Sequence, residues 1–422
     1  MSTLSYTPIN LGRWIVWGGT ALVFIVAPHV FTNSFALTML TQMGAFIILA
    51  LSYNMLLGQS GMLSFGHAVY SGLGAYMTVH ALNMVGKGAL SLPLPLLPLV
   101  GGFAGLAFGV IFGYVTTRKS GTTFAMISLG IGEMVFACAL MFPGFFGGEA
   151  GISTNRVVGQ PFLGMTFGPA IQVYYLVAFW SFVCMAAMFA LTQTPLGRMA
   201  NAVRDNPERT EFVGYNTQHV RFLQMVLASF FAGISGGLSC INFEIVSAEN
   251  VSAIRSGGVL LATFIGGIPF FFGPVIGALV FIFFVVALSG FTKAWLLYLG
   301  LFFLAMVLYA PGGLASLLLM QIPVIRARRF GELAVPYLLA GGAALLALAG
   351  LIGIVEMVYR LSEQGASTVL TAFGWSFDAT SAASWAVFGL MLGGGLVALR
   401  YASRLVGERW GAIQSDFLGR GV

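Results

Sequence analysis

The stretch from Ile171 to Leu191, IQVYYLVAFWSFVCMAAMFAL, decides the class of fold, because none of its side chains carries a charge. A helix rises about 1.5 Å per residue, so about 20 apolar residues cross a hydrocarbon core of about 30 Å. Further apolar runs lie at residues 35–57, 92–115, 333–355 and 385–399. The alternating segments of about ten residues that build membrane β-barrels are missing from the sequence. The sequence therefore predicts an all-α, polytopic transmembrane helical bundle.

The composition argues against a soluble globular protein. Of the 422 residues, 58% are hydrophobic and only 8% are charged, and the mean hydropathy is +0.94. Soluble domains carry about 25% charged residues, which help to cover a surface that faces water. We therefore expect lipid to be the solvent for most of this chain.

The net charge of +6 indicates membrane topology rather than a nucleic-acid partner. With the N-terminus inside, the basic residues divide fourteen to five between the two sides, the bias of a bacterial inner-membrane protein. The smaller set is Lys87, Arg156, Arg255, Lys293 and Arg360. The larger set is Arg13, Arg118, Lys119, Arg198, Arg204, Arg209, Arg221, Arg326, Arg328, Arg329, Arg400, Arg404, Arg409 and Arg420. We expect both termini to be cytoplasmic, residues 142–169 to lie outside, and membrane lipid to be a partner.

Twelve membrane segments are predicted, at residues 14–30, 35–57, 62–83, 92–115, 121–141, 171–191, 221–242, 254–268, 274–290, 294–310, 333–356 and 384–403. The first ten form a core domain at residues 1–320. The last two form a hairpin in a C-terminal extension, residues 321–422, which begins with a basic linker. Segment 62–83 is polar for a span, and segment 254–268 would rise only about 22 Å. Both are candidates for broken or re-entrant helices, which line protein cavities.

Glycine is the second organising feature, at 56 of 422 residues against a usual share of about 7%. Within one segment it recurs every fourth residue, at Gly101, Gly105, Gly109 and Gly113. Gly233 and Gly237 repeat the spacing, as do Gly273 and Gly277. Such stripes are smooth, so they let two helix backbones approach closely within a membrane.

The loop at residues 193–220 is the most charged stretch of the chain, and it contains the signals of a short helix. Asn206 (or Asp205) suits the N-cap and Pro207 suits the first helical position. Acidic residues favour the first turn, and glycine favours the end. The sequence predicts a helix from Pro207 to Val213, which is too short to persist alone and is expected to dock onto something. An ordinary capped loop is the alternative. The residues of this element are Arg204, Asp205, Asn206, Pro207, Glu208, Glu211 and Gly214.

No catalytic constellation is visible in the sequence. None of Lys87, Lys119 and Lys293 lies in a GxxxxGK[ST] phosphate-binding motif. Histidines, cysteines and carboxylates do not cluster at the spacing of metal ligands. We expect no cofactor and no enzymatic activity in this chain, so any ATP would be bound by a separate subunit.

Several motifs resemble those of one family. The segment Arg204 to Asn216, RDNPERTEFVGYN, resembles the cytoplasmic coupling loop of high-affinity branched-chain amino acid ABC permeases, of the second, M-type kind. Gly58 to Tyr76, GQSGMLSFGHAVYSGLGAY, is similar to the family's glycine-rich motif with its Ser-x-Gly-His core. The run Ala125 to Val135, with Glu133 and the later Gly147, Gly148, Gly151 and Ile152, resembles its fifth span and outer loop. Two further stretches, Leu261 to Gly277 and Ala310 to Leu314, also resemble segments of this family. The resemblance therefore covers about residues 35–320.

The resemblance implies a transmembrane permease subunit of an ABC importer for branched-chain or related amino acids. It also implies the partners: a homologous second permease, two cytoplasmic ATPase subunits and a solute-binding protein. The loop that ends in a helix and Gly214 would contact the ATPase. A urea, short-amide or aromatic-acid permease of the same family is the first alternative. A secondary transporter acting alone is the second, although it would need more intramembrane charge for ion coupling.

Few ionisable side chains lie within the predicted segments. Glu133 lies in an apolar run, where an unpaired carboxylate costs several kcal/mol. It is a candidate to line the pathway and contact a substrate ammonium group, and a structural hydrogen-bond acceptor is the alternative. Ser64 and His67 are further pathway candidates, with ordinary packing as the alternative. Glu244, Glu249 and Arg255 are predicted at an outer mouth, where they either contact a docked binding protein or face solvent.

Overall fold

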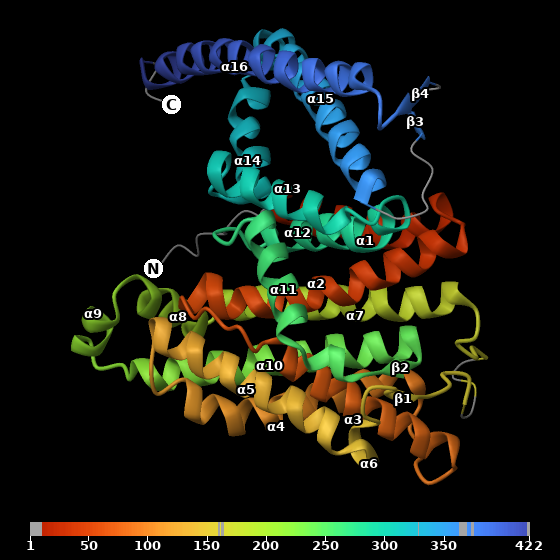
Figure 1. Ribbon diagram of the computed structural model, residues 1–422. Helices are drawn as coiled ribbons and strands as arrows, with labels where there is room; N and C mark the ends of the chain where they lie inside the picture. The colour runs from red at the N-terminus through yellow and green to blue at the C-terminus, as the bar shows by residue number, and fades with distance from the viewer. Residues whose placement is uncertain are drawn as a thin grey trace. The chain divides into compact units, whose positions relative to one another are not determined.

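The computed structural model describes residues 11–158, 161, 164–327, 329–362, 369–372 and 375–419 (Figure 1). Arg328 and Arg420, which count toward the charge asymmetry, lie outside the described residues. The described chain is mostly helical, and its strands form only two antiparallel pairs. The prediction of an all-α polytopic membrane protein is confirmed.

The helices are α1 (Leu11–Val30), α2 (Ser34–Ser60), α3 (Ala68–Gly86), α4 (Leu97–Thr116), α5 (Gly121–Met141), α6 (Pro143–Phe146), α7 (Ala170–Gln193), α8 (Pro195–Asp205), α9 (Pro207–Phe212), α10 (Thr217–Phe243), α11 (Ala253–Gly266), α12 (Gly273–Ile282), α13 (Trp295–Tyr309), α14 (Gly313–Arg326), α15 (Phe330–Ser362) and α16 (Ala382–Gly419). Short helical turns are η1 (Leu94–Leu96), η2 (Ala248–Val251), η3 (Phe283–Ala287) and η4 (Leu288–Gly290). The strand pairs are β1 (Ile152–Ser153) with β2 (Ile245–Val246), and β3 (Val369–Ala372) with β4 (Trp375–Asp378).

Eight of the described helical segments are long and apolar enough to cross a membrane: Ser34–Ser60, Leu94–Thr116, Gly121–Met141, Ala170–Gln193, Thr217–Phe243, Gly273–Phe291, Phe330–Ser362 and Ala382–Ser415. The pair α13 and α14, bent by 48°, makes a ninth if it is one span. Trp14–Val30 and α11 are apolar but shorter. Four of the twelve predicted segments, 14–30, 62–83, 254–268 and 294–310, are not among these eight, and the helix of segment 62–83 begins only at Ala68.

The chain divides into two compact units. The first comprises Met1–Gly290 and Leu301–Ala315, and the second comprises Phe291–Gly300 and Ser316–Val422. The predicted domain boundary after residue 320 falls inside α14. Its last residues, 321–326, were predicted to begin a basic linker; they are helical and continue a helix that apolar residues dominate up to Pro323. Within the second unit, Gly350 of α15 lies close to Leu392 of α16, and Gly395 of α16 lies close to Ala347.

The glycine stripe of α4 packs against α10, as the spacing predicts. A Cβ at Gly101 would lie 2.6 Å from the carbonyl oxygen of Gly233, and one at Gly105 would lie 2.2 Å from that of Ser229. Gly109 and Gly113 continue the contact along the same face. α10 also packs against α2 and α3, so this close approach joins α4 to the other helices of the first unit.

Candidate functional site

The charged loop between α7 and α10 contains two helices, where the sequence predicted one. The predicted short helix is α9, and its cap is as predicted: the Asn206 side chain accepts a hydrogen bond from the Arg209 amide at 2.9 Å. Gly214 follows with a φ of +95°, a conformation that favours glycine. α8 was missed, although Thr194 caps it and Pro195 occupies its first turn. The charges of this stretch led to its assignment as loop.

The end of α9 and the residues that follow it present an apolar surface that was not predicted from the sequence. Phe212 is 90% exposed, Val213 is 71% exposed and Tyr215 is 48% exposed. Thr210 points the other way and is buried. Beside Val213 and Tyr215, a cavity of about 290 Å³ opens between α8 and α9. Three exposed apolar side chains in the most charged loop indicate a contact surface.

α8 is tied directly to the end of α2. The Arg204 guanidinium donates through Nη1 to the carbonyl oxygen of Gly58, and through Nε to Asp205 at 2.9 Å. Its aliphatic part lies over Gly61, where a Cβ would be 3.0 Å from Arg204 Cγ. On the other side, Glu211 accepts a hydrogen bond from Thr217, the first residue of α10, at 2.7 Å. The short helix is therefore connected to two long helices of the core.

The structure places all of the predicted coupling residues in α8, in α9 or directly beside them. Arg204 and Asp205 form an ion pair at 2.9 Å. Asn206 caps α9, Pro207 begins it, and Glu208 is exposed in its first turn. Glu211 accepts a hydrogen bond from Thr217 of α10, and Gly214 follows α9 with a positive φ.

Residues 61–67, between α2 and α3, form a non-helical segment inside the protein. Hydroxyl groups from other helices bond to the backbone here: Ser128 of α5 accepts from the Phe65 amide at 3.1 Å, and Ser256 of α11 accepts from the amide of Ala68, the first residue of α3, at 3.1 Å. Gly66 packs against the Ser128 carbonyl group. Irregular backbone within a membrane protein needs such internal partners. The predicted break in segment 62–83 thus lies at its beginning.

The three pathway candidates occupy different environments. Ser64 and His67 are fully buried, and His67 Nε2 lies 2.9 Å from Ser52 Oγ. The Ser64 hydroxyl and His67 Nδ1 have no partner among the described residues. Glu133 instead lies on the exposed face of α5, and it forms no hydrogen bond or ion pair within the described part of the chain.

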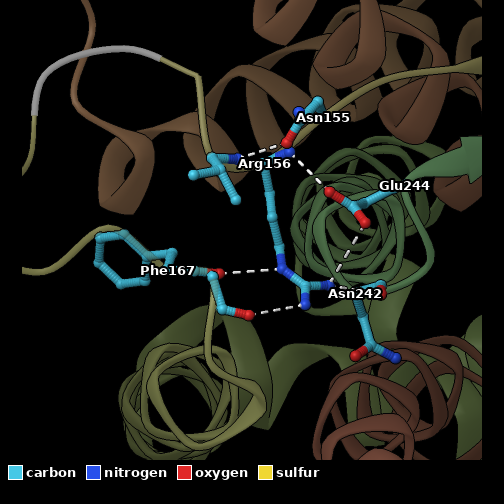
Figure 2. A network of polar contacts seen from close by, with 7 residues as sticks. Asn155, Arg156, Phe167, Asn242 and Glu244 are labelled. Carbon is cyan, nitrogen blue, oxygen red and sulfur yellow. Dashed lines mark hydrogen bonds and ion pairs between the residues drawn. The ribbon is translucent and has the colours of Figure 1, made fainter.

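The Arg156 side chain links the segment between α5 and α7 to the C-terminal end of α10 through hydrogen bonds and an ion pair (Figure 2). Its Nε donates to the Phe167 carbonyl group at 2.9 Å, and its Nη2 donates to that of Gly168 at 3.1 Å. Its Nη1 donates to the Asn242 carbonyl group at 3.2 Å and lies 3.7 Å from Glu244. Glu244 also accepts from the Arg156 amide at 2.8 Å. Glu244 is therefore engaged within the chain.

Replacing Arg156 by glutamine should destabilise the first unit by about 2 kcal/mol or more, because several carbonyl groups lose a charged donor. The melting temperature of the chain in detergent should fall by about 5 °C. Lys87→Gln is the matched control, since it removes one exposed positive charge from the same set of loops. Equal melting temperatures for Arg156→Gln and Lys87→Gln would show that the network contributes nothing.

The other two predicted mouth residues follow Glu244 along the chain. Glu249 is exposed in η2. Arg255 lies in the first turn of α11 and is part-buried, next to the Ser256 that holds the α2–α3 segment. The structure thus separates the trio, with Glu244 in the Arg156 network and Arg255 deeper, beside residues 65–68.

Comparisons with known proteins identify the family. The family described as "Branched-chain amino acid transport system / permease component" matches residues 35–311. The permease protein LivM of Escherichia coli K12, of the high-affinity branched-chain amino acid transport system, is 26% identical over 68% of this chain and 71% of its own length. LivM of Salmonella typhimurium LT2 is 25% identical over 74% of this chain and 77% of its length.

An archaeal protein agrees with these two. The probable branched-chain amino acid transport permease LivM of Methanocaldococcus jannaschii is 24% identical over 64% of this chain and 90% of its own length. No solved structure matches the chain. The family match spans α2 to α13 and includes both the α8–α9 loop and the α2–α3 segment. On this evidence the chain belongs to the permease component family of branched-chain amino acid transport systems.

Proposed function

We propose that this chain is one of two permease subunits of an ABC importer that carries branched-chain amino acids across the bacterial inner membrane. The observation that supports this most is α9, a capped two-turn helix with an exposed apolar tip, in a chain of the permease family. Such a helix is too short to be stable alone, so its exposed face suits a partner. In this proposal the partner is a separate ATPase subunit.

The mechanism proposed is alternating access driven from the α8–α9 loop. Closure of the two ATPases moves α9, and the Arg204 contact with Gly58 passes that motion to the end of α2. Beyond α2, the Phe65 amide bonds to Ser128 of α5, and the amide of Ala68, the first residue of α3, bonds to Ser256 of α11. A displacement at α2 therefore reaches the helices around a central path. A solute-binding protein delivers the substrate on the opposite side.

The orientation proposed places both termini and the α8–α9 loop in the cytoplasm, because that side carries fourteen of the nineteen basic residues. Cysteines introduced at Glu149 and Phe212, both exposed, test it in a chain lacking Cys138. A membrane-impermeant thiol reagent should label Glu149→Cys in intact cells and Phe212→Cys only after lysis. Labelling of both positions in intact cells would refute the orientation.

Gene deletion tests the substrate class. Cells that lack this chain should lose high-affinity uptake of L-leucine, L-isoleucine and L-valine, and the wild-type gene should restore it. Loss of urea, short-amide or aromatic-acid uptake with normal leucine uptake would favour the alternative substrates instead. The relatives named for branched-chain amino acid transport support the first outcome.

A further inference from the structure

α5 packs against the rest of the first unit through one face only. Its buried residues recur at helical spacing, and among their neighbours are residues 61–67, η2 and α11. They are Phe124, Ala125, Ser128, Gly132, Val135 and Ala139. Because a helix turns by about 100° per residue, exposed residues at the same spacing form the opposite face. This unpacked face of α5 comprises Met126, Gly130, Glu133, Met134, Ala137 and Met141.

A carboxylate lies at the middle of the unpacked face. Glu133 is about 18 Å from the first residue of α5, a helix of 21 residues that is about 30 Å long. α5 is apolar and long enough to span a membrane, and Glu133 is its only charged residue. Within the described part of the chain, Glu133 forms no hydrogen bond or ion pair. An ionised carboxylate at this depth is strongly unfavourable against lipid, so the unpacked face requires a polar neighbour.

The composition of the unpacked face differs from that of the exposed face of α4. On α4 the exposed residues include Phe103, Val110, Ile111 and Val115, and no residue of that helix is charged. Branched and aromatic side chains without charge suit contact with lipid. On α5 three of the six residues are methionines, whose flexible side chains adapt to a protein surface. The two consecutive helices therefore present different surfaces, and that of α5 suits a protein partner.

Small residues flank Glu133 on the unpacked face. Gly130 lies one turn before it, and no atom lies within 4 Å of a Cβ at that position. Ala137 lies one turn after it and is also exposed. Small residues at this spacing let a second transmembrane helix approach the backbone closely. A partner helix on this face would bring its side chains within reach of the Glu133 carboxylate.

The charge of Glu133 also indicates which kind of protein covers the face. A symmetric contact between two copies of this chain places the same residues on both sides of the interface. Two Glu133 carboxylates would then face one another inside the membrane, where like charges repel strongly. A helix from a different chain can instead offer a hydrogen-bond donor to the carboxylate. A homologous but non-identical permease is such a chain.

We infer that the unpacked face of α5 is the surface on which the second permease docks, with a hydrogen-bond donor of that permease bound to Glu133. This inference rests on the proposed function, since it assumes a complex of two different permeases. Glu133 then holds the two subunits together within the membrane. The contact also accounts for a carboxylate that has no partner in the described part of this chain.

Photocrosslinking tests the surface in the assembled complex of both permeases and the ATPase. p-Benzoylphenylalanine introduced at Met134 should form an adduct with the second permease on irradiation, and mass spectrometry of the adduct should identify both chains. The same probe at Ile111, which is exposed on α4, is the matched control and should give no adduct with that permease. A Met134 adduct with a second copy of this chain, with another part of the same chain or with lipid alone would overturn the inference.

Substitution of Glu133 tests the carboxylate itself. Glu133→Leu should reduce the amount of second permease that co-purifies with the tagged chain by about tenfold, because an apolar side chain cannot accept the hydrogen bond. Glu133→Gln retains an acceptor and should recover most of the partner. The isolated Glu133→Leu chain should melt at or above the temperature of wild type, since no bond within the chain is lost. A lower melting temperature would mean that Glu133 supports the fold of this chain, and would overturn the inference.

The outcomes separate this inference from the proposed function. If Glu133→Leu and wild type recover equal amounts of the second permease, the α5 interface is refuted. Leucine import by those same complexes would leave the proposed function intact. If the wild-type chain recovers no second permease at all, the interface and the proposed function both fail.

Discussion

Leucine at position 105 should prevent the chain from folding, and this is the largest effect we expect from a single substitution. A Cβ at Gly105 would lie 2.2 Å from the Ser229 carbonyl oxygen and 3.0 Å from the Gly233 Cα atom. Both are backbone atoms of α10, which cannot rotate aside as a side chain can. Overpacking in a core costs about 1–3 kcal/mol when side chains can adjust, and more when they cannot. Because α10 also packs on α2 and α3, the damage should spread through the first unit.

Size-exclusion chromatography of the tagged chain in mild detergent measures whether the variant folds. Gly105→Leu should give little or no monodisperse protein, while wild type gives a single peak. Gly130→Leu is the matched control, because this glycine lies in α5 with nothing within 4 Å of a Cβ. If Gly105→Leu elutes like Gly130→Leu, the α4–α10 contact is not as close as described.

Phe212→Ser should lower ATP-driven uptake by about 30-fold while the chain stays folded. The side chain is 90% exposed, so its removal costs the isolated chain little. An aromatic side chain at the centre of an interface contributes about 2 kcal/mol or more to binding, which corresponds to roughly 30-fold. The fold decrease is measured as uptake of labelled L-leucine by proteoliposomes that contain the complete complex. Val157→Ser changes an apolar residue that is 49% exposed in another loop, and should leave uptake unchanged.

Gly214→Val separates the shape of the loop from its contact surface. No atom lies within 4 Å of a Cβ at this position, so a side chain meets no steric clash there. Its φ of +95° still disfavours any β-branched residue, by about 1–2 kcal/mol. Gly214→Val should therefore reduce uptake without reducing the yield of folded chain. Normal uptake by both Phe212→Ser and Gly214→Val would remove the loop from the coupling mechanism.

The parts of this fold that the sequence predicts are those with a local signal. The glycines of α4 recur every fourth residue, so one face of one helix carries the whole contact. Asn206 and Pro207 act within their own turn, which makes the start of α9 visible in the sequence. Long apolar runs identify the spans for the same reason.

The parts that the sequence does not predict depend on residues that are distant in the chain. The Arg156 side chain binds the carbonyl groups of Phe167, Gly168 and Asn242, and carbonyl groups have no sequence signature. Arg204 of α8 likewise donates a hydrogen bond to the carbonyl group of Gly58 in α2, which is distant in the sequence. The polar residues of segment 62–83 indicated a break, but the hydroxyls that stabilise it belong to α5 and α11. The exposed apolar tip of α9 had a weak signal, an aromatic residue inside a charged loop.

The central claim is that this chain forms a transport path whose energy comes from another subunit. Proteoliposomes that contain the chain, its partner permease, the ATPase and the binding protein test it directly. The account predicts that L-leucine accumulates only with ATP on the α8–α9 side, and that accumulation stops when the ATPase subunit carries an inactivating change at its nucleotide site. Accumulation of leucine by liposomes that contain this chain alone, without ATP, would contradict the account.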